Sequence, residues 1–322
     1  MSVLTPVLNE EQGLDEVLER FRGQADPGGE IEFLFIDGGS TDDTRGLLER
    51  AAADDPRVHV LDNPRQITSA GLNVGLSVAR GEFVARMDAH ALYPPAYLRT
   101  GVDRLRRGDA AAVSGPQIAV GRDPWSRRIA TALSTALGVG SSNFRRPVDR
   151  EVETDSGFTG LWRRETVMRY GGWDELAYPN EDSELAARIR ADGGRLMLIP
   201  GMAAEYTPRN SIASLWRQYW RYGRGRGRTA RLHRNSIRVG HALCPALVLT
   251  VIGATTPIGP VRRPARRALL VYLSALLATA ARVNSRRDAP YVPLVLVVMH
   301  VSWGAGYLLG VTTKRPALKP LG

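Results

Sequence analysis

The sequence predicts an open α/β sheet with helices on both faces, followed by a region of apolar helices at the C-terminal end. Short, continuous apolar runs alternate with helical patterns over the first two-thirds of the chain, as in a mainly parallel sheet that is buried on both faces. Acidic residues stand directly after several of these runs. The last third contains long stretches without charged side chains. Ligands of open α/β sheets bind at the carboxyl ends of the strands, which is where the acids fall.

Six apolar runs have the length and composition of buried strands. They cover residues 3–8, 31–36, 58–61, 82–87, 110–114 and 195–199. Two helices are predicted after the first two runs. The first has apolar residues at Leu14, Val17, Leu18 and Phe21, and the second at Leu47, Leu48 and Ala51. Asn9, with Gln12 three residues on, is the expected N-cap of the first helix, and Thr41 or Asp42 that of the second.

Composition excludes several classes of protein. A single cysteine, Cys244, excludes a disulfide scaffold, and 43% hydrophobic with 24% charged residues excludes a disordered chain. The net charge of +10 would by itself suggest a nucleic-acid or anionic-membrane partner. It divides unevenly, however, into −8 for residues 1–205 and +18 for residues 206–322, where Asp288 is the single acid. The two parts are therefore expected to have different partners.

The basic last third has the pattern of a membrane region. Residues 239–261, 268–281 and 289–313 contain no Asp, Glu, Lys or Arg, and the first and third are long enough for the roughly 20 residues of a spanning helix. Arginine clusters around these runs fit anionic lipid headgroups. We expect membrane attachment by two or three apolar helices; a buried helical domain of a soluble protein is the alternative. The predicted organisation is a catalytic domain at 1–225, a basic interfacial linker at 226–238 and a membrane region at 239–322.

Three acidic segments follow apolar runs or open helices. Asp37 ends the run 33–36, Asp88 ends 83–87 and opens Asp88-Ala89-His90, and Glu181-Asp182 precedes a helix expected over 183–192. A single Asp in such a place is commonly a turn former or helix cap. A carboxylate and an imidazole two residues apart can also bind one divalent cation, and these ligand types suit Mn²⁺ or Mg²⁺. The segments therefore predict a metal-assisted site at the sheet edge.

In their order along the chain, six segments resemble the family 2 glycosyltransferases, which have the GT-A fold. They are Thr5-Pro6-Val7-Leu8-Asn9-Glu10-Glu11, Ile36-Asp37-Gly38-Gly39-Ser40-Thr41-Asp42, Asn73 with Gly81-Glu82-Phe83, Asp88-Ala89-His90, Gly171-Gly172-Trp173-Asp174-Glu175 and Asn180-Glu181-Asp182. The resemblance covers about residues 1–225. Asp88-Ala89-His90, together with residues 208–211 and 218–223, resembles the succinoglycan-type exopolysaccharide glycosyltransferases in particular.

The resemblance implies a binding site for a nucleotide-sugar donor. Thr5, Pro6 and Glu10 match the segment of the family that lines the nucleotide. Asp37 matches the acid that hydrogen-bonds the base or the ribose, and Arg65 is expected to contact the same nucleotide.

The resemblance also implies a metal site and a general base. Asp88 and His90 match the metal-binding D-x-D motif, with His90 where the family has its second Asp, and the implied cofactor is Mn²⁺ or Mg²⁺. Asp182 matches the catalytic base, which removes the acceptor hydroxyl proton in a single inverting displacement. Neighbouring acids would raise the pKa of this group and a helix N-terminus would lower it.

The acceptor or its diphosphate is expected to meet Glu181 and the segment from Gln218 to Tyr222. This segment matches the Q-x-x-R-W motif of the family, with Arg221 in the motif and Tyr222 where Trp is usual. An aromatic ring is retained there as a platform for a sugar face.

The implied function is inverting, metal-dependent transfer of a hexose, with glucose as the first candidate, from a UDP-sugar to a polyprenyl-diphosphate-linked glycan. We expect this in exopolysaccharide or cell-surface polysaccharide synthesis at the bacterial inner membrane, with the catalytic domain facing the cytoplasm and no nucleic-acid partner. One alternative is a nucleotidyltransferase that makes nucleotide-sugars, although the Gly-rich signature of such enzymes does not follow the first run. The others are a nucleic-acid-binding protein that uses the basic last third and a non-catalytic membrane scaffold.

Overall fold

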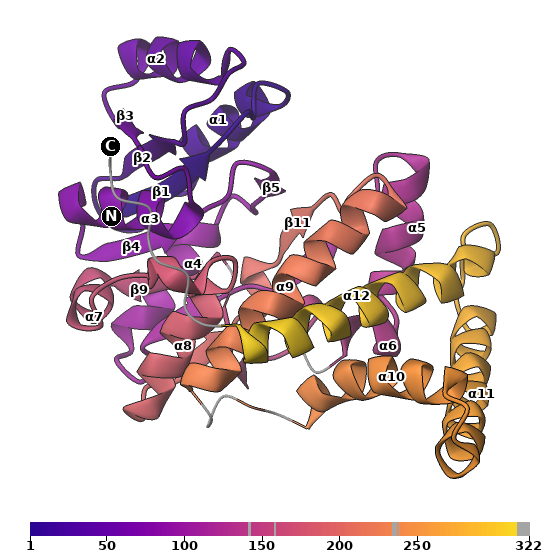
Figure 1. The fold of residues 1–322 in the computed structure, drawn as a ribbon. Helices are drawn as coiled ribbons and strands as arrows, with labels where there is room; N and C mark the ends of the chain where they lie inside the picture. Colours follow the sequence, from indigo (N-terminus) through magenta and orange to yellow (C-terminus); the bar gives the residue numbers. More distant parts are fainter. Residues whose placement is uncertain (141–142, 158, 234–236, 238, 314–322) are drawn as a thin grey trace. The chain divides into compact units, whose positions relative to one another are not determined.

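The structure is a computed structural model that describes residues 1–140, 143–157, 159–233, 237 and 239–313 (Figure 1). Parts of the expected basic linker, at 234–236 and 238, and residues 314–322 of the expected membrane region lie outside the described residues. The described chain forms two compact units. Unit 1 comprises Met1–Ile118 and Arg146–Tyr206, and unit 2 comprises Ala119–Arg145 and Thr207–Arg315.

Unit 1 contains the predicted α/β sheet. Its eight strands are ordered β3-β2-β1-β4-β9-β6-β10-β8. They are β1 (Ser2–Val7), β2 (Glu32–Asp37), β3 (Val58–Asp62), β4 (Phe83–Arg86), β6 (Ala112–Ser114), β8 (Val152–Thr154), β9 (Leu161–Arg163) and β10 (Leu196–Leu198). All six predicted strands are present, with ends shifted by one or two residues. β3, β2, β1 and β4 are parallel, whereas β9 is antiparallel to both β4 and β6, so the sheet is mixed.

Helices cover both faces of this sheet, as expected. They are α1 (Leu14–Arg22), α2 (Thr44–Asp54), α3 (Thr68–Val78), α4 (Tyr97–Arg106), α7 (Arg164–Arg169) and α8 (Glu181–Ala191). Alternate strand residues point to opposite faces: Val3 and Phe33 pack with Phe21 of α1, while Leu4 and Leu34 pack in a second cluster with α3 and α8. A smaller sheet has the order β5 (Ala91–Leu92), β11 (Ala204–Tyr206), β7 (Gln117–Ala119).

The expected helix caps were wrong, because polar side chains of the loop after β1 and of the loop after β2 form hydrogen bonds between the two loops. α1 is preceded by Gly13 at φ 103°, and Asn9 instead has φ 56° and accepts the Thr41 N–H at 2.8 Å. The N-cap of α2 is Asp43, although the Asp42 side chain does accept the Thr44 N–H at 3.1 Å. These contacts join the loop after β1 to the loop after β2.

Unit 2 is helical. Its helices are α5 (Pro124–Leu133), α6 (Ala136–Val139), α9 (Ile212–Leu232), α10 (Gly240–Thr255), α11 (Gly259–Ala281) and α12 (Val292–Thr312). α9 begins at the cap Ser211, whose hydroxyl accepts the Ser214 N–H at 3.2 Å, and it continues without a break across the boundary that was expected after residue 225. The division between the units falls earlier in the chain, at 206/207.

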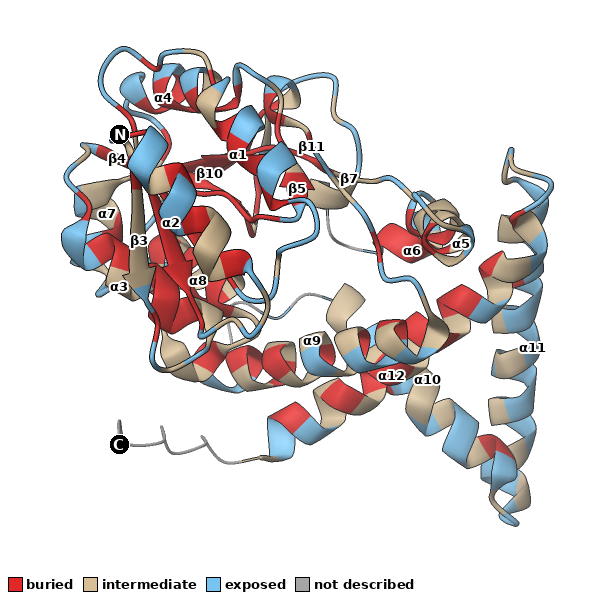
Figure 2. Cartoon of the chain, turned by 90° about the horizontal axis from the view of Figure 1, so that it is seen from above, coloured by how far each residue is buried: buried red, intermediate tan, exposed pale blue. Residues whose placement is uncertain are grey.

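Within the described part of the chain, one helical segment, Ala289–Thr312, is long and apolar enough to cross a membrane by length and composition. The run expected at 239–261 forms the shorter helix α10, which ends at Thr255. α12 packs closely against α9 because glycines let their backbones approach: a Cβ on Gly223 would lie 2.0 Å from the Trp303 carbonyl oxygen. Figure 2 shows buried positions along α12, whereas α11 is mainly exposed or intermediate.

We predict that Gly223→Ala destabilises unit 2, because the added methyl group forces α9 and α12 apart; overpacking of this kind costs about 1–3 kcal/mol. The measurement is thermal unfolding of the full chain in detergent. Gly259→Ala is the matched control, since a Cβ there meets nothing within 4 Å. Equal melting temperatures of the two variants would contradict the packing.

Candidate active site

The candidate site lies in unit 1, where parallel strands end at one edge of the sheet. In the strand register Val7 of β1 pairs with Asp37 of β2, and Leu4 of β1 pairs with Arg86 of β4. Asp37 is the last residue of β2, and the loops after β1 and β4 carry Glu10 and Asp88. The fold therefore brings the predicted donor-binding and metal-binding segments to the same edge of one sheet.

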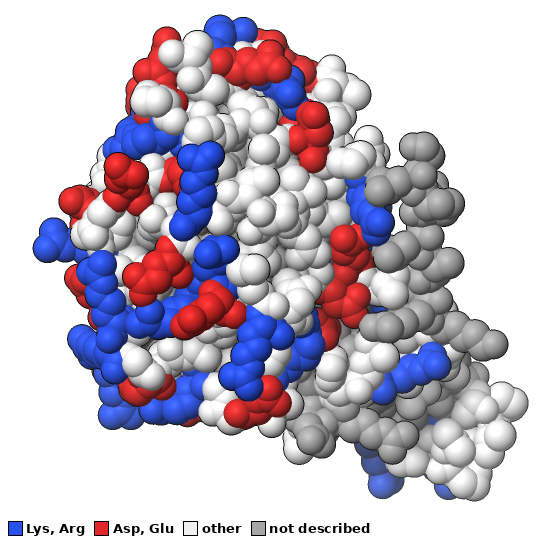
Figure 3. All heavy atoms as spheres, turned by 90° about the vertical axis from the view of Figure 1, so that its left-hand side faces the viewer, with Lys and Arg blue, Asp and Glu red and all other residues white. Residues whose placement is uncertain are grey.

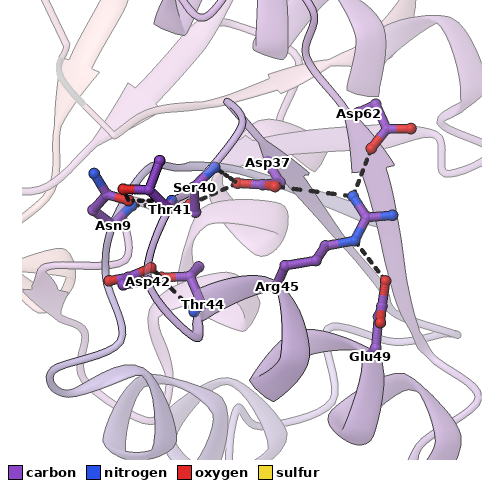
Figure 4. Close-up of polar contacts among 9 residues, drawn as sticks. All are labelled: Asn9, Asp37, Ser40, Thr41, Asp42, Thr44, Arg45, Glu49 and Asp62. Carbon is purple, nitrogen blue, oxygen red and sulfur yellow. Dashed lines mark hydrogen bonds and ion pairs between the residues drawn. The ribbon is translucent and has the colours of Figure 1, made fainter.

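Asp37 is buried at the end of β2 and is held in a fixed orientation (Figure 4). Its Oδ1 accepts the backbone N–H of Ser40 at 3.0 Å and the Ser40 hydroxyl at 2.7 Å. Its Oδ2 lies 3.9 Å from Nη1 of Arg45, which pairs more closely with Asp62. Oδ2 thus keeps the capacity to accept a hydrogen bond from a ligand hydroxyl or amine.

The three residues that were expected to line the nucleotide, Thr5, Pro6 and Glu10, differ in their exposure at this edge of the sheet. The Thr5 side chain is fully buried, and its Oγ1 has no hydrogen-bond partner among the described residues, so Thr5 lies beneath the surface. Pro6 is half-buried, and the side chain of Glu10 is partly exposed. Glu10 Oε1 is 3.6 Å from Nδ1 of His90, a proximity that the sequence did not predict. Arg65, the other expected nucleotide contact, is held by Glu175 Oε2 at 2.5 Å.

A buried arginine that no sequence motif indicated, Arg86, connects Asp88 with Glu181 and Asp182. The Arg86 side chain is 5% exposed, and its Nε–H donates to Asp88 Oδ1 at 2.9 Å. Its Nη1 donates to Asp182 Oδ2 at 2.7 Å and to Glu181 Oε1 at 3.1 Å. An arginine inside the apolar run 82–87 was the available signal, because a buried charge needs partners.

The cluster has three carboxylates for one guanidinium, and this excess shifts the pKa of Asp182. The pKa of Asp182 is raised to about 7: burial is the largest cause, Arg86 opposes it, and the neighbouring Glu181 and Asp88 add to the increase. For Asp88, burial alone would raise the pKa, but Arg86 and His90 outweigh burial and the pKa is lowered. The Asp182 carboxyl can therefore take up and release a proton near neutral pH, as a general base must.

Asp182 is oriented by a second set of contacts. α8 begins at Glu181, two residues earlier than expected, so both acids lie in its first turn. The Trp173 indole N–H donates to Asp182 Oδ1 at 3.2 Å. The side-chain amide of Asn73 holds the Trp173 backbone from both sides, at 2.8 and 2.9 Å. Gly172 permits this approach: it has φ 75°, and a Cβ there would lie 2.4 Å from Asn73 Oδ1. These contacts explain the Gly171-Gly172-Trp173 segment.

The donor groups at this edge fit a divalent cation that takes part of its ligands from a phosphate. Among the residues that the structure describes, no group of three or more His, Cys, Asp or Glu side chains is arranged to hold a metal ion. Asp88 and an exposed His90 supply one carboxylate and one imidazole, and Glu181 Oε2 is buried without a hydrogen-bond partner among the residues that the structure describes. Mg²⁺ and similar ions commonly bind one or two carboxylates and complete their shell with water and substrate phosphates.

The expected acceptor segment lies in unit 2, on α9. The Gln218 side-chain amide donates to the Tyr222 hydroxyl at 3.0 Å, and the rings of Tyr219 and Tyr222 are 5.8 Å apart. Arg221 is exposed. The residues of this segment therefore support one another within one helix.

Most arginines of unit 1 are paired with acids. Examples are Arg57 with Asp55 at 2.8 Å and Arg104 with Asp109 at 2.5 Å. Figure 3 shows basic and acidic side chains interspersed on one face of the molecule. This arrangement agrees with the acidic balance of the first two-thirds of the chain.

Comparison with known proteins gives consistent matches. The model of the family described as glycosyl transferase family 2 matches residues 2–171. The succinoglycan biosynthesis protein ExoA of Rhizobium meliloti (strain 1021) is 33% identical over 311 residues, which cover 95% of this chain and 93% of that protein. An undecaprenyl-phosphate 4-deoxy-4-formamido-L-arabinose transferase of Pseudomonas syringae is 35% identical over 98 residues, 30% of this chain and 29% of the relative.

A solved structure has a similar fold. It is the mannosyltransferase PcManGT from Pyrobaculum calidifontis in complex with GDP-Man and Mn²⁺, with a TM-score of 0.62 and 20% identity. The match covers 95% of this chain and 86% of that one. At this identity the likeness concerns the fold, and it agrees with the mixed sheet and its helices.

We predict that Asp182→Asn changes the pH dependence of stability. Because the folded state raises the pKa of Asp182 from 3.8 to about 7, its contribution to the free energy of unfolding is lost as pH rises between these values. Asparagine cannot ionise, so the variant should not lose this contribution. As pH is raised from 5 to 8, the free energy of unfolding of the variant should therefore increase relative to that of the parent, by on the order of 2–4 kcal/mol.

Unfolding of both proteins, followed by tryptophan fluorescence at the two pH values, measures this difference. Asp192→Asn at the other end of α8 is the matched control, because Asp192 is exposed. An Asp182→Asn variant with the parent's pH dependence would refute the buried cluster as described.

Proposed function

The chain belongs to glycosyl transferase family 2, and from this premise we propose that it transfers a hexose from a nucleotide-sugar to a lipid-linked glycan acceptor, with inversion. One observation carries the proposal: the buried Asp182 has a pKa near neutrality and is held by Arg86 and Trp173 at the sheet edge that also bears Asp37 and Asp88. Family membership supports this function over the nucleotidyltransferase and nucleic-acid-binding alternatives.

Asp182 acts as the general base of a single displacement. Its carboxylate takes the proton of the acceptor hydroxyl as that oxygen attacks the anomeric carbon. The new glycosidic bond forms while the bond from the anomeric carbon to the diphosphate breaks, and the nucleoside diphosphate departs. We assign the proton to Oδ1, because this oxygen accepts the longer bond, from Trp173 at 3.2 Å, whereas Oδ2 accepts from Arg86 at 2.7 Å.

The donor nucleotide is bound by the loops after β1 and β2. Asp37 Oδ2 accepts from the base or ribose, and Pro6, Glu10 and Arg65 line the nucleotide, with Thr5 supporting them from below. Asp88 and His90 would hold a divalent cation, Mn²⁺ or Mg²⁺, which supplies charge neutralisation for the departing diphosphate when it is bound. The Mn²⁺ of the mannosyltransferase structure supports this choice of cofactor.

The acceptor side is assigned to Glu181 and to Gln218, Arg221 and Tyr222. A planar guanidinium suits a diphosphate, and the aromatic ring suits a sugar face. The names of the succinoglycan and undecaprenyl-phosphate relatives support a polyprenyl-diphosphate-linked glycan in exopolysaccharide synthesis. We place the protein at the bacterial inner membrane with unit 1 in the cytoplasm.

The first test is sugar transfer by membranes that contain the full chain, with UDP-glucose, UDP-galactose, UDP-GlcNAc and GDP-mannose offered in turn. We expect transfer from a UDP-sugar, at a rate that rises with pH through about 7 as Asp182 loses its proton. Asp182→Asn should lower the rate by about 10²–10⁴-fold, the usual size of general-base catalysis, while UDP still binds. Asp192→Asn is the control. A fully active Asp182→Asn enzyme would overturn the assignment of the base.

The second test concerns the cation. Asp88→Asn removes the charged ligand and should weaken the Mn²⁺-dependent binding of UDP by about tenfold or more, measured by calorimetry with and without EDTA. Asp103→Asn, on α4, is exposed and should leave this binding unchanged. If the Asp88→Asn protein binds UDP with the parent's dependence on Mn²⁺, Asp88 is not a metal ligand.

A further inference from the structure

α12, which has the composition of a membrane span, is partly buried by other helices of unit 2. Along its C-terminal half it packs against α9: a Cβ on Gly306 would lie 2.2 Å from the Trp220 carbonyl oxygen, and one on Gly310 equally close to that of Arg224. In its N-terminal half, His300 Nε2 lies 3.1 Å from the carbonyl oxygen of Leu137, just after α5. Nine residues of α12 are buried. Other helices therefore cover much of α12.

The helix that covers the C-terminal half of α12 carries a row of arginines. Arg217, Arg221, Arg224, Arg228 and Arg231 recur at i, i+4, i+7, i+11 and i+14, which places them on one face of α9. The Nε atoms of Arg224 and Arg228 are buried without a hydrogen-bond partner among the described residues, and the sequence from 206 to 287 contains no Asp or Glu. If α12 crossed a bilayer, α9 would carry these charges into the hydrocarbon, where arginine is strongly disfavoured.

The exposed apolar surface of unit 2 lies elsewhere, on α10 and α11. Large hydrophobic side chains are exposed there at Leu243, Leu249, Val251, Ile252, Leu270, Val271, Leu273 and Leu277. Val271, for example, is 71% exposed. On α12 itself the exposed large side chains are Leu294, Leu309 and Val311, at 47% or less. α10 and α11 pack against each other, and exposed apolar patches commonly mark a binding surface.

The charges beside the apolar part of α11 indicate what kind of partner binds there. Arginines stand on either side of the apolar part of α11: Arg262, Arg263, Arg266 and Arg267 precede it, and Arg282, Arg286 and Arg287 follow it. The one acid beside them, Asp288, is buried and accepts the Ser285 hydroxyl at 2.8 Å. Apolar side chains next to unneutralised arginines match acyl chains next to lipid phosphates.

We propose that unit 2 attaches to one leaflet of an anionic membrane through the exposed apolar side chains of α10 and α11, and that α12 does not cross the bilayer. The apolar part of α11, residues 268–281, is 14 residues long, or about 21 Å of helix, against a hydrocarbon core of about 30 Å. The inference refines the membrane location in the proposed function and rests on that function only for the choice of a bacterial membrane.

The first experiment measures binding of the purified full chain to preformed vesicles by flotation. Leu270→Gln/Leu277→Gln should weaken binding to phosphatidylglycerol vesicles about tenfold or more, because two exposed side chains that enter the acyl region become polar. Leu294→Gln/Leu309→Gln, the same change on α12, is the matched control and should alter binding less than twofold. All four residues are exposed, so neither pair disturbs a core. Equal loss in both pairs, or loss in the α12 pair alone, would overturn the proposal.

The charge contribution is tested with Arg263→Gln/Arg267→Gln, two exposed positions on α11. These changes should reduce the preference for phosphatidylglycerol over phosphatidylcholine vesicles about tenfold or more, and 1 M salt should reduce the parent's preference in the same way. An unchanged preference would contradict the match with lipid phosphates. UDP binding is measured in every variant; because UDP binding belongs to unit 1, failure of the membrane proposal remains distinguishable from failure of the proposed enzymatic function.

The second experiment locates both ends of α11 and α12. Three variants, Gly259→Cys, Asn284→Cys and Thr312→Cys, are made separately in a Cys244→Ser background. Each is labelled with a membrane-impermeant maleimide in spheroplasts and in inverted vesicles. We expect all three positions to react from the same side. Labelling of Asn284 and Thr312 from opposite sides would show that α12 crosses, and labelling of Gly259 and Asn284 from opposite sides would show that α11 crosses. Either result would overturn the proposal.

Discussion

The guanidinium of Arg86 holds together two segments that are 95 residues apart in the chain, because Asp88 follows β4 and Glu181 opens α8. Each carboxylate in this cluster is buried, so none could be present as an anion without a positive partner nearby. The relative placement of the strand end and the helix start, and therefore the distance between the proposed metal ligand and the proposed base, depends on this one side chain. Removing a partner from such a buried group typically costs about 3–5 kcal/mol.

The cluster is not optimal for stability, and its imbalance is what suits it to proton transfer. Burial raises the pKa of Asp182, and one arginine cannot neutralise three acids, so the Asp182 carboxyl holds its proton to higher pH than an exposed aspartate would. The surrounding fold compensates with rigid contacts: the Asn73 amide fixes Trp173, and Trp173 fixes Asp182. This is the usual relation between an active site and its scaffold, in which local instability is offset elsewhere.

Local patterns predicted the elements well, and distant partners account for what they missed. Continuous apolar runs identified the strands, and the spacing of Leu14, Val17, Leu18 and Phe21 identified a helix whose four apolar residues are all buried. Asn9 was misread because its partner, Thr41, is remote in sequence, and Arg86 was overlooked because two of its three acids lie on another element. The run at 289–313 has the same composition whether it faces lipid or other helices, so only its packing separates the two.

The chain passes between the two units more than once. After Ile118 it leaves unit 1 to form α5 and α6 in unit 2, returns at Arg146, and leaves again after Tyr206. A single cut near residue 206, the natural choice for isolating a catalytic fragment, would therefore retain residues 119–145 without the helices they pack on. In such a fragment α5 would lose its contact with α12. The architecture thus makes aggregation of truncated forms an expected outcome, and it favours purification of the intact chain in detergent.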